Sequence, residues 1–219
     1  DDAMSAAIPI PFAFNFYGVA VTQLYVTSNG YIQIQTSTAN STLPQTLPDA
    51  ATPNNIIALA WDDLIVDPST NTGSAVQYFV SGSAPNRIMA VQYINLRFIG
   101  GTAAENVTGQ IRLFESDSHI EVHVTTVNDN GNNYSKTLGI ENALGSSGSA
   151  PLGRNNTAWN VTTSEAWSFA QSSVTYAWSP ATFLSSTSIY NPVATALNAT
   201  TSYSVTVTNT ATGCSGSSN

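Results

Sequence analysis

Charged residues are scarce in this sequence. Asp, Glu, Lys and Arg make up 8% of the 219 residues, against about 25% in an ordinary soluble domain. The five basic residues are scattered and leave a net charge of −8. Nucleic-acid binding needs clustered Lys and Arg, so we expect no nucleic-acid partner. Ser, Thr, Asn and Gln take the place of ions, and a surface of hydroxyl and amide groups points outside the cell.

Cysteine and long apolar runs are also scarce. The single cysteine, Cys214, cannot form a disulfide within the chain, and an odd cysteine in a secreted protein suggests a partner in another chain or in a further segment. No run of about 18 apolar residues occurs, so we expect no transmembrane helix and no membrane insertion. The sequence starts at Asp1 rather than Met, which indicates either an arbitrary boundary or, as we favour, a mature N-terminus after signal-peptide removal.

What the sequence does contain is a dense series of strand patterns. Hydrophobic residues make up 42% of the chain, enough for a sizeable core. Asn29-Gly30 lies between the alternating runs 24–27 and 31–35, which predicts a hairpin with a type I′ turn. The continuous apolar run 56–61 predicts a strand buried on both faces. Further strands are expected at 75–80, 87–98, 110–115, 119–124, 137–140 and 166–169.

The texture changes near residue 170. We expect an all-β chain in which a jelly-roll-like β-sandwich, 1–170, precedes a short and incomplete immunoglobulin-like β unit, 171–219. Strands are expected at 174–178 and 203–208, with a short edge strand at 191–196. About fifty residues are too few to close two sheets comfortably.

Few residues have the types and spacing that chemistry requires. His119 and His123 lie on an alternating strand, roughly 13 Å apart, too far to share one zinc ion, so they are interpreted as part of a solvent-facing polar row. Asp62, Asp63 and Asp67 follow a buried strand and suggest Ca²⁺ ligands or, more simply, acids that cap turns. No nucleophile elbow, phosphate loop or Cys/His cluster occurs. We therefore expect no enzymatic activity and no obligatory cofactor.

Sugars are the other ligand that the sequence suggests. The amide-rich stretch 128–133 could contact a sugar or a metal, although the same residues also form tight turns. Trp159 stands among polar residues and is the candidate sugar contact, whereas Trp178 resembles a core tryptophan of an immunoglobulin-like strand. Six Asn-x-Ser/Thr sequons are candidate glycosylation sites, at Asn40, Asn106, Asn133, Asn155, Asn160 and Asn198.

Two resemblances add to this interpretation. The segments 8–18, 25–31, 53–63, 84–87 and 138–142 resemble, in order, a β-sandwich domain of large secreted bacterial surface proteins. The segments 176–182, 191–195, 201–208 and 213–214 look like the immunoglobulin-like repeats of adhesins from gliding bacteria that use type IX secretion. The early cysteine-bearing strand of those repeats is missing here, and so is the final strand after Cys214. The resemblance implies surface display and adhesion, with no catalytic residues.

These observations favour an extracellular structural or adhesive protein, a filament subunit or a segment of an adhesin stalk. Its partners would be copies of itself, neighbouring repeats or surface glycans. A neighbour would complete the second unit by strand pairing, through the candidate intermolecular residues Tyr203, Val205, Val207 and Cys214. The alternatives are a carbohydrate-binding module and an accessory domain of a secreted enzyme.

Overall fold

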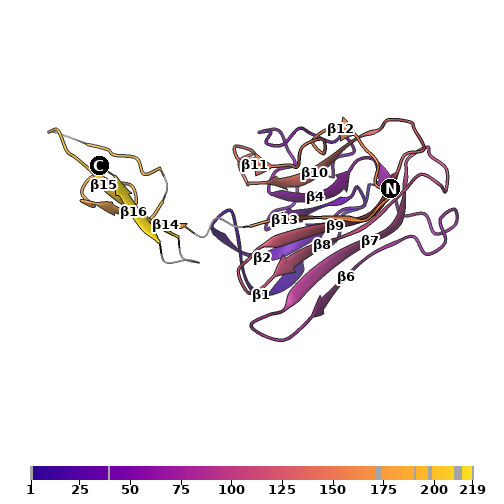
Figure 1. Cartoon of the computed structure of the whole chain (residues 1–219), viewed down its shortest axis with the longest axis horizontal. Helices are drawn as coiled ribbons and strands as arrows, with labels where there is room; N and C mark the ends of the chain where they lie inside the picture. The colour runs from indigo at the N-terminus through magenta and orange to yellow at the C-terminus, as the bar shows by residue number, and fades with distance from the viewer. Residues whose placement is uncertain are drawn as a thin grey trace. The chain divides into compact units, whose positions relative to one another are not determined.

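The computed structural model describes residues 2–38, 40–170, 174–189, 191–196, 199–209 and 214–218. The chain divides into two compact units, Asp1–Gln171 and Ser172–Asn219, and each unit is described by itself. The described residues form strands, turns and loops but no helix (Figure 1). The predicted all-β sandwich fold is confirmed.

The first unit contains two antiparallel sheets. The first sheet has seven strands in the order β1-β2-β3-β4-β10-β11, with β12 beside β10. These strands are β1 (Ile8–Phe16), β2 (Val19–Val26), β3 (Tyr31–Ile34), β4 (Ile56–Trp61), β10 (Ser135–Glu141), β11 (Gly148–Ser149) and β12 (Thr157–Ala158).

The second sheet has six strands in the order β13-β9-β8-β7-β5, with β6 also paired to β7. Its members are β5 (Leu64–Ile65), β6 (Ala75–Ser81), β7 (Ile88–Phe98), β8 (Asn106–Phe114), β9 (Ile120–Asn128) and β13 (Glu165–Phe169). Between β9 and β10 the chain crosses from the second sheet to the first.

The main core lies between the inner faces of these two sheets. Phe14 and Leu59 from the first sheet and Tyr93, Ile111 and Val122 from the second are members of one buried cluster. Because side chains alternate along a strand, β8 and β9 bury every second residue over most of their length. A smaller cluster covers the outer side of the first sheet, and its members are Tyr31, Leu47, Ile56, Ala58 and Trp61. Strand β4 is therefore buried on both faces, as its sequence predicted.

The predicted hairpin is present, but its turn is not type I′. Strands β2 and β3 pair antiparallel through Val26 and Ile32. Gly30 has a positive φ of 75°, whereas Asn29 does not, and a type I′ turn needs both. Asn29 is instead buried, where its Oδ1 accepts a hydrogen bond from the Leu64 backbone N–H (3.1 Å). Asn29 therefore anchors the hairpin to the distant residue Leu64 and does not adopt the left-handed conformation that a type I′ turn requires.

The second unit is one antiparallel sheet in the order β14-β15-β16, formed by β14 (Val174–Ser179), β15 (Ser204–Asn209) and β16 (Ser215–Ser218). Two expectations need correction. The edge strand expected at 191–196 is reduced to a single bridge between Ala194 and Leu184. A strand does follow Cys214, because β16 pairs with β15.

Candidate functional sites

The three aspartates after β4 do not form one site. The Asp67 carboxylate is 2.9 Å from the Arg97 guanidinium and also accepts hydrogen bonds from Ser69 and Thr70. These hydrogen bonds, that from Ser69 first, lower the pKa of Asp67. Among the described residues, no group of three or more His, Cys, Asp or Glu side chains is arranged to hold a metal ion. The Arg97 ion pair thus occupies the carboxylate that the Ca²⁺ interpretation required.

Asp62 is partly buried and, unlike that of Asp67, its pKa is raised. Burial raises the pKa of Asp62 to about 6, opposed by the Asp63 backbone N–H and by the positive charge of Lys136. The Asp63 N–H donates to Asp62 Oδ1 at 2.8 Å. Asp62 is therefore an acid whose protonation changes near neutral pH, next to a buried lysine.

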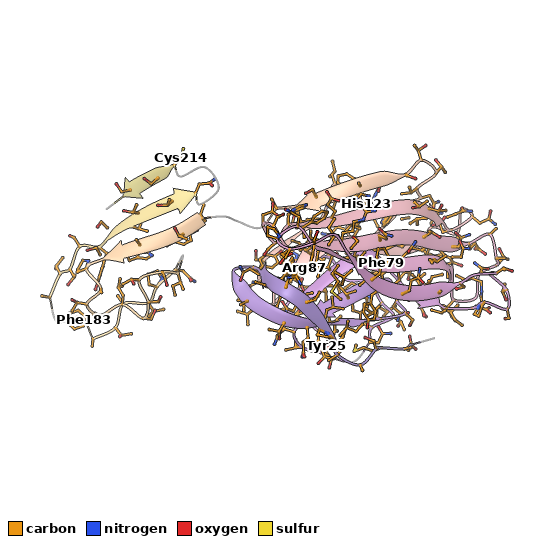
Figure 2. The ribbon with its side chains drawn as sticks, turned by 90° about the horizontal axis from the view of Figure 1, so that it is seen from below. Tyr25, Phe79, Arg87, His123, Phe183 and Cys214 are labelled. Carbon is orange, nitrogen blue, oxygen red and sulfur yellow. The ribbon has the colours of Figure 1, made fainter. Side chains whose placement is uncertain are left out.

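The two histidines lie in a polar row on the second sheet. His123 is on β9 and contacts Glu121 (Nε2 to Oε2, 2.7 Å), while His119 precedes the strand and stacks on Phe114 with ring centroids 3.9 Å apart. His123, labelled in Figure 2, lines a polar hollow together with Gln92 and Arg112. Within the described part of the chain, the ring nitrogens of His119 and His123 are hydrogen-bonded to Asp117 and Glu121, not to a Ser or Cys nucleophile.

The amide-rich stretch 128–133 is organised by a buried ion pair. Asp129 and Lys136 are both buried, and their carboxylate and ammonium groups are 2.9 Å apart. Lys136 Nζ also donates to the Tyr134 backbone carbonyl (2.6 Å). It lies over the rings of Phe98 and Trp159, at 5.2 and 5.9 Å from the ring centroids.

Further hydrogen bonds hold Asp129. Its Oδ1 accepts from Asn160 Nδ2 (2.8 Å) and from the Gly131 N–H (3.0 Å), and its Oδ2 accepts from the Tyr134 N–H (3.1 Å). The Asp129 backbone N–H donates to Asn160 Oδ1 (2.9 Å). Burial raises the pKa of Asp129, but the hydrogen bonds from Asn160 and Lys136 outweigh it and lower the pKa. Burial lowers the pKa of Lys136, opposed by Asp129.

The Lys136 site was not predicted, although the sequence contains a signal for it. In the alternation of β10, residue 136 shares a face with Leu138 and Ile140, which are both core residues. A lysine at an inward position requires a buried counter-charge. Asp129 lies two residues after the core residue Val127, so the same alternation of side chains predicts an inward position for it.

The interpretation of Trp159 as a sugar contact is corrected by the structure. Trp159 is only 7% exposed and belongs to the main core. Its Nε1 donates to the Lys136 backbone carbonyl (3.0 Å), and the Arg154 guanidinium lies 4.8 Å from its ring centroid. The ring therefore has no free face on which a sugar could stack, because the core and Arg154 cover it.

The sequons differ in how their side chains are used. Nδ2 donates a hydrogen bond within the fold at Asn40, Asn106, Asn155 and Asn160. A sugar attached at Nδ2 would replace one of its two N–H hydrogens. Asn133 is exposed, and Asn198 lies outside the described residues. Glycosylation of any of the six stays a prediction.

The second unit presents an apolar sheet face without a core. Tyr176 pairs with Val207 and Trp178 with Val205 across β14 and β15, yet no described residue of this unit is buried. Tyr203 donates its hydroxyl to the Thr182 carbonyl (2.8 Å), and Cys214 is exposed (Figure 2). The sequence from 172 to 219 contains no Asp, Glu, Lys, Arg or His.

A second apolar surface lies on the first unit. Strand β6 pairs with β7 and exposes Tyr78, Phe79 and Val80, of which Phe79 is labelled in Figure 2. A mostly apolar hollow of about 330 Å³ lies where β6 approaches the N-terminal segment around Met4 and Ile8. An uncharged, exposed strand of this kind is a template for pairing with another chain.

Residues 1–180 match the family model described as NIDO related, and the chain belongs to this family. This membership points to a domain of the extracellular type. No curated protein and no solved structure matches the chain. In the described part of the chain, no helix is both long and apolar enough to cross a membrane.

Proposed function

We propose that this chain is a non-catalytic, extracellular structural or adhesive module whose second unit is completed by a neighbouring polypeptide, either another copy or an adjoining repeat. The observation that carries the proposal is the absence of any buried side chain among the described residues of the second unit. Strands β14 and β15 nevertheless align five apolar side chains by cross-strand pairing, Val174, Tyr176, Trp178, Val205 and Val207.

A sheet with one apolar face is stable when a second layer covers that face. Covering a Val side chain contributes about 1.5–3 kcal/mol, and an aromatic ring adds a larger area. The outer strands β14 and β16 each have a strand neighbour on one side only, although the Trp178 N–H of β14 donates to the Thr187 carbonyl (2.9 Å). A neighbour could therefore add a sheet face, a strand, or both.

The ionisable residues support a role without catalysis. Asp67 is held by Arg97, Glu115 by Arg87 and Glu165 by Arg154. These ion pairs stabilise loops and strand ends of the sandwich. The resemblance to adhesins of gliding bacteria and the NIDO-related family both favour display at a surface, and type IX secretion belongs to the same proposal.

The test is self-association of the whole chain. We expect sedimentation velocity to show assembly that increases with concentration, and electron microscopy to show the assemblies as fibres. The double variant Val205→Ser/Val207→Ser should remain monomeric, whereas Thr206→Ser on the opposite face of β15 should assemble like the wild type. A wild-type chain that stays monomeric and cooperatively folded, with its second unit resistant to proteases, would contradict the proposal.

The carbohydrate-binding alternative predicts a different result. Because Trp159 is buried, the sequence no longer offers its best aromatic ring for stacking. A glycan array probed with the wild-type chain should therefore be blank, and reproducible binding of one glycan class would favour the alternative.

A further inference from the structure

The only lysine of the chain is completely buried. Lysine side chains are almost never fully buried unless they are paired, and Lys136 has no exposed side-chain surface. Its partner, Asp129, is equally enclosed. Asp129 follows β9 of the second sheet and Lys136 lies on β10 of the first, so the pair joins the two layers of the sandwich at the point where the chain crosses between them.

The surroundings of this pair exclude water on the side of the rings. Phe98 and Trp159 lie against the Lys136 ammonium. The polar contacts of Nζ are the Asp129 carboxylate and the Tyr134 carbonyl. In such an apolar environment burial penalises the ammonium form of Lys136 and lowers its pKa, so the neutral amine becomes more accessible than in water.

Both oxygens of the Asp129 carboxyl group accept two hydrogen bonds. Oδ1 accepts from Asn160 Nδ2 and from the Gly131 N–H, while Oδ2 accepts from Lys136 Nζ and from the Tyr134 N–H. Two N–H donors on one carboxyl oxygen are the arrangement that stabilises an oxyanion during attack on the carboxyl carbon.

A third titratable group interacts with the pair through its charge. Strand β4 pairs with β10 so that Trp61 is opposite Thr137, and Asp62 directly follows Trp61 while Lys136 directly precedes Thr137. Asp62 interacts electrostatically with both Lys136 and Asp129. Because burial raises its pKa to about 6, Asp62 can both accept and donate a proton at neutral pH.

We propose that Lys136 Nζ and Asp129 Cγ condense to an intramolecular amide that covalently joins the two sheets, with Asp62 as the group that transfers the proton. The proposal does not depend on the function proposed above. It rests on the burial, the contact distance and the three-residue arrangement.

The step is balanced without an oxidant, a reductant or a further reactant. A proton first moves from the Lys136 ammonium to the Asp129 carboxylate, which leaves a neutral amine facing a neutral acid. The Nζ lone pair attacks Cγ, and the electrons of the C=O bond move to Oδ1, where Asn160 and Gly131 stabilise them. Asp62 takes a proton from Nζ and delivers it to Oδ2; the electrons on Oδ1 then re-form the C=O bond as the C–Oδ2 bond breaks, and Oδ2 leaves as water.

The mass of the denatured whole chain tests the proposal directly. We expect an intact mass lower than the sequence mass by one water molecule. A lysine-specific endoproteinase can cut this chain only after Lys136, and it should leave the denatured wild type uncut because the amine is acylated. A full sequence mass together with cleavage at Lys136 would overturn the proposal, and neither measurement depends on a variant that must fold.

Variants identify the groups involved. Lys136→Arg and Asp129→Ala should each have the full sequence mass. Water loss retained in Lys136→Arg would mean cyclisation elsewhere, for instance at Asp129-Asn130, and would overturn the amide. Asp62→Asn should lose the bond, whereas the matched neighbour variant Asp63→Asn should keep it. An Asp62→Asn chain that still lacks one water would overturn the role of Asp62.

Discussion

Glu141 is the clearest case of a side chain that the fold holds in an unfavourable environment. It is fully buried on β10, where its Oε2 accepts a hydrogen bond from the Asp49 N–H (2.6 Å) and its Oε1 has no hydrogen-bond partner. Burial raises the pKa of Glu141 to about 7, opposed by the Asp49 N–H, and the negative charge of Asp49 raises it further.

This raised pKa makes the stability of the fold depend on pH. The folded protein binds the Glu141 proton more tightly than the unfolded chain does, so the contribution is complete below about pH 4.5 and is lost as the pH rises through 7. The size is about 3 kcal/mol, from the free energy that corresponds to each pKa unit. Glu141→Gln should remove this contribution to the slope between pH 4.5 and 7 and leave the one from Asp62, whose pKa is also raised. Urea denaturation across that window would measure it, and identical slopes in both proteins would contradict the assignment.

Trp159 gives a second prediction at this scale. Because its ring fills space in the core, Trp159→Ala should lower the free energy of unfolding by about 3–5 kcal/mol. Leu152→Ala, at a fully exposed site, should change it by less than about 0.5 kcal/mol. Chemical denaturation compares the two, and a Trp159→Ala protein as stable as the wild type would place the ring outside the core.

Individual strands were predictable where alternation is clean and unbroken. The hairpin of β2 and β3 and the doubly buried β4 follow from local patterns alone. Strand β1 also alternates, with Ile8, Ile10, Phe12, Phe14 and Phe16 buried, yet its prolines lack the N–H groups that a ladder needs. The structure accommodates them because β1 is the outermost strand of its sheet and shifts register between Pro9 and Phe14.

The buried pair of Asp129 and Lys136 shows what local pattern cannot supply. The sequence predicts a turn at 128–133, and the structure contains one, with Asn130 and Gly131 at positive φ. The depth of that turn depends on Phe98 and Trp159 packing against the lysine. Those residues come from distant segments, so their meeting is a property of the tertiary fold. Trp159 was misplaced because its sequence neighbours are polar while its spacing from Val161 points it inward.

Gly30 provides a prediction at the scale of the hairpin. It has a positive φ, and a Cβ added there would lie 2.5 Å from the Ala60 carbonyl oxygen. Gly18 has a similar φ but no atom within 4 Å of such a Cβ. Gly18→Ala should therefore cost about 1 kcal/mol for backbone strain alone, and Gly30→Ala clearly more. Thermal unfolding of the two variants measures the difference, and equal losses would mean that the close approach to β4 does not matter.

At the scale of the whole molecule, the two units differ in how they are stabilised. The first has a two-layer core, whereas no described residue of the second is buried. Local stability follows buried contacts, so a broad-specificity protease acting on dilute native protein should digest the second unit and leave a fragment close to Asp1–Gln171. Mass spectrometry of the time course identifies the fragment. Assembled protein should be protected, and simultaneous digestion of both units would contradict the difference.

The lack of ionic side chains in residues 172–219 determines how any joint made by that sheet responds to its surroundings. Because such a joint has no charges to screen, a change in salt concentration should affect it far less than it affects an ion-paired contact. Its strength would come from apolar contact, which weakens on cooling. Such a joint would loosen in the cold and tighten with moderate warming.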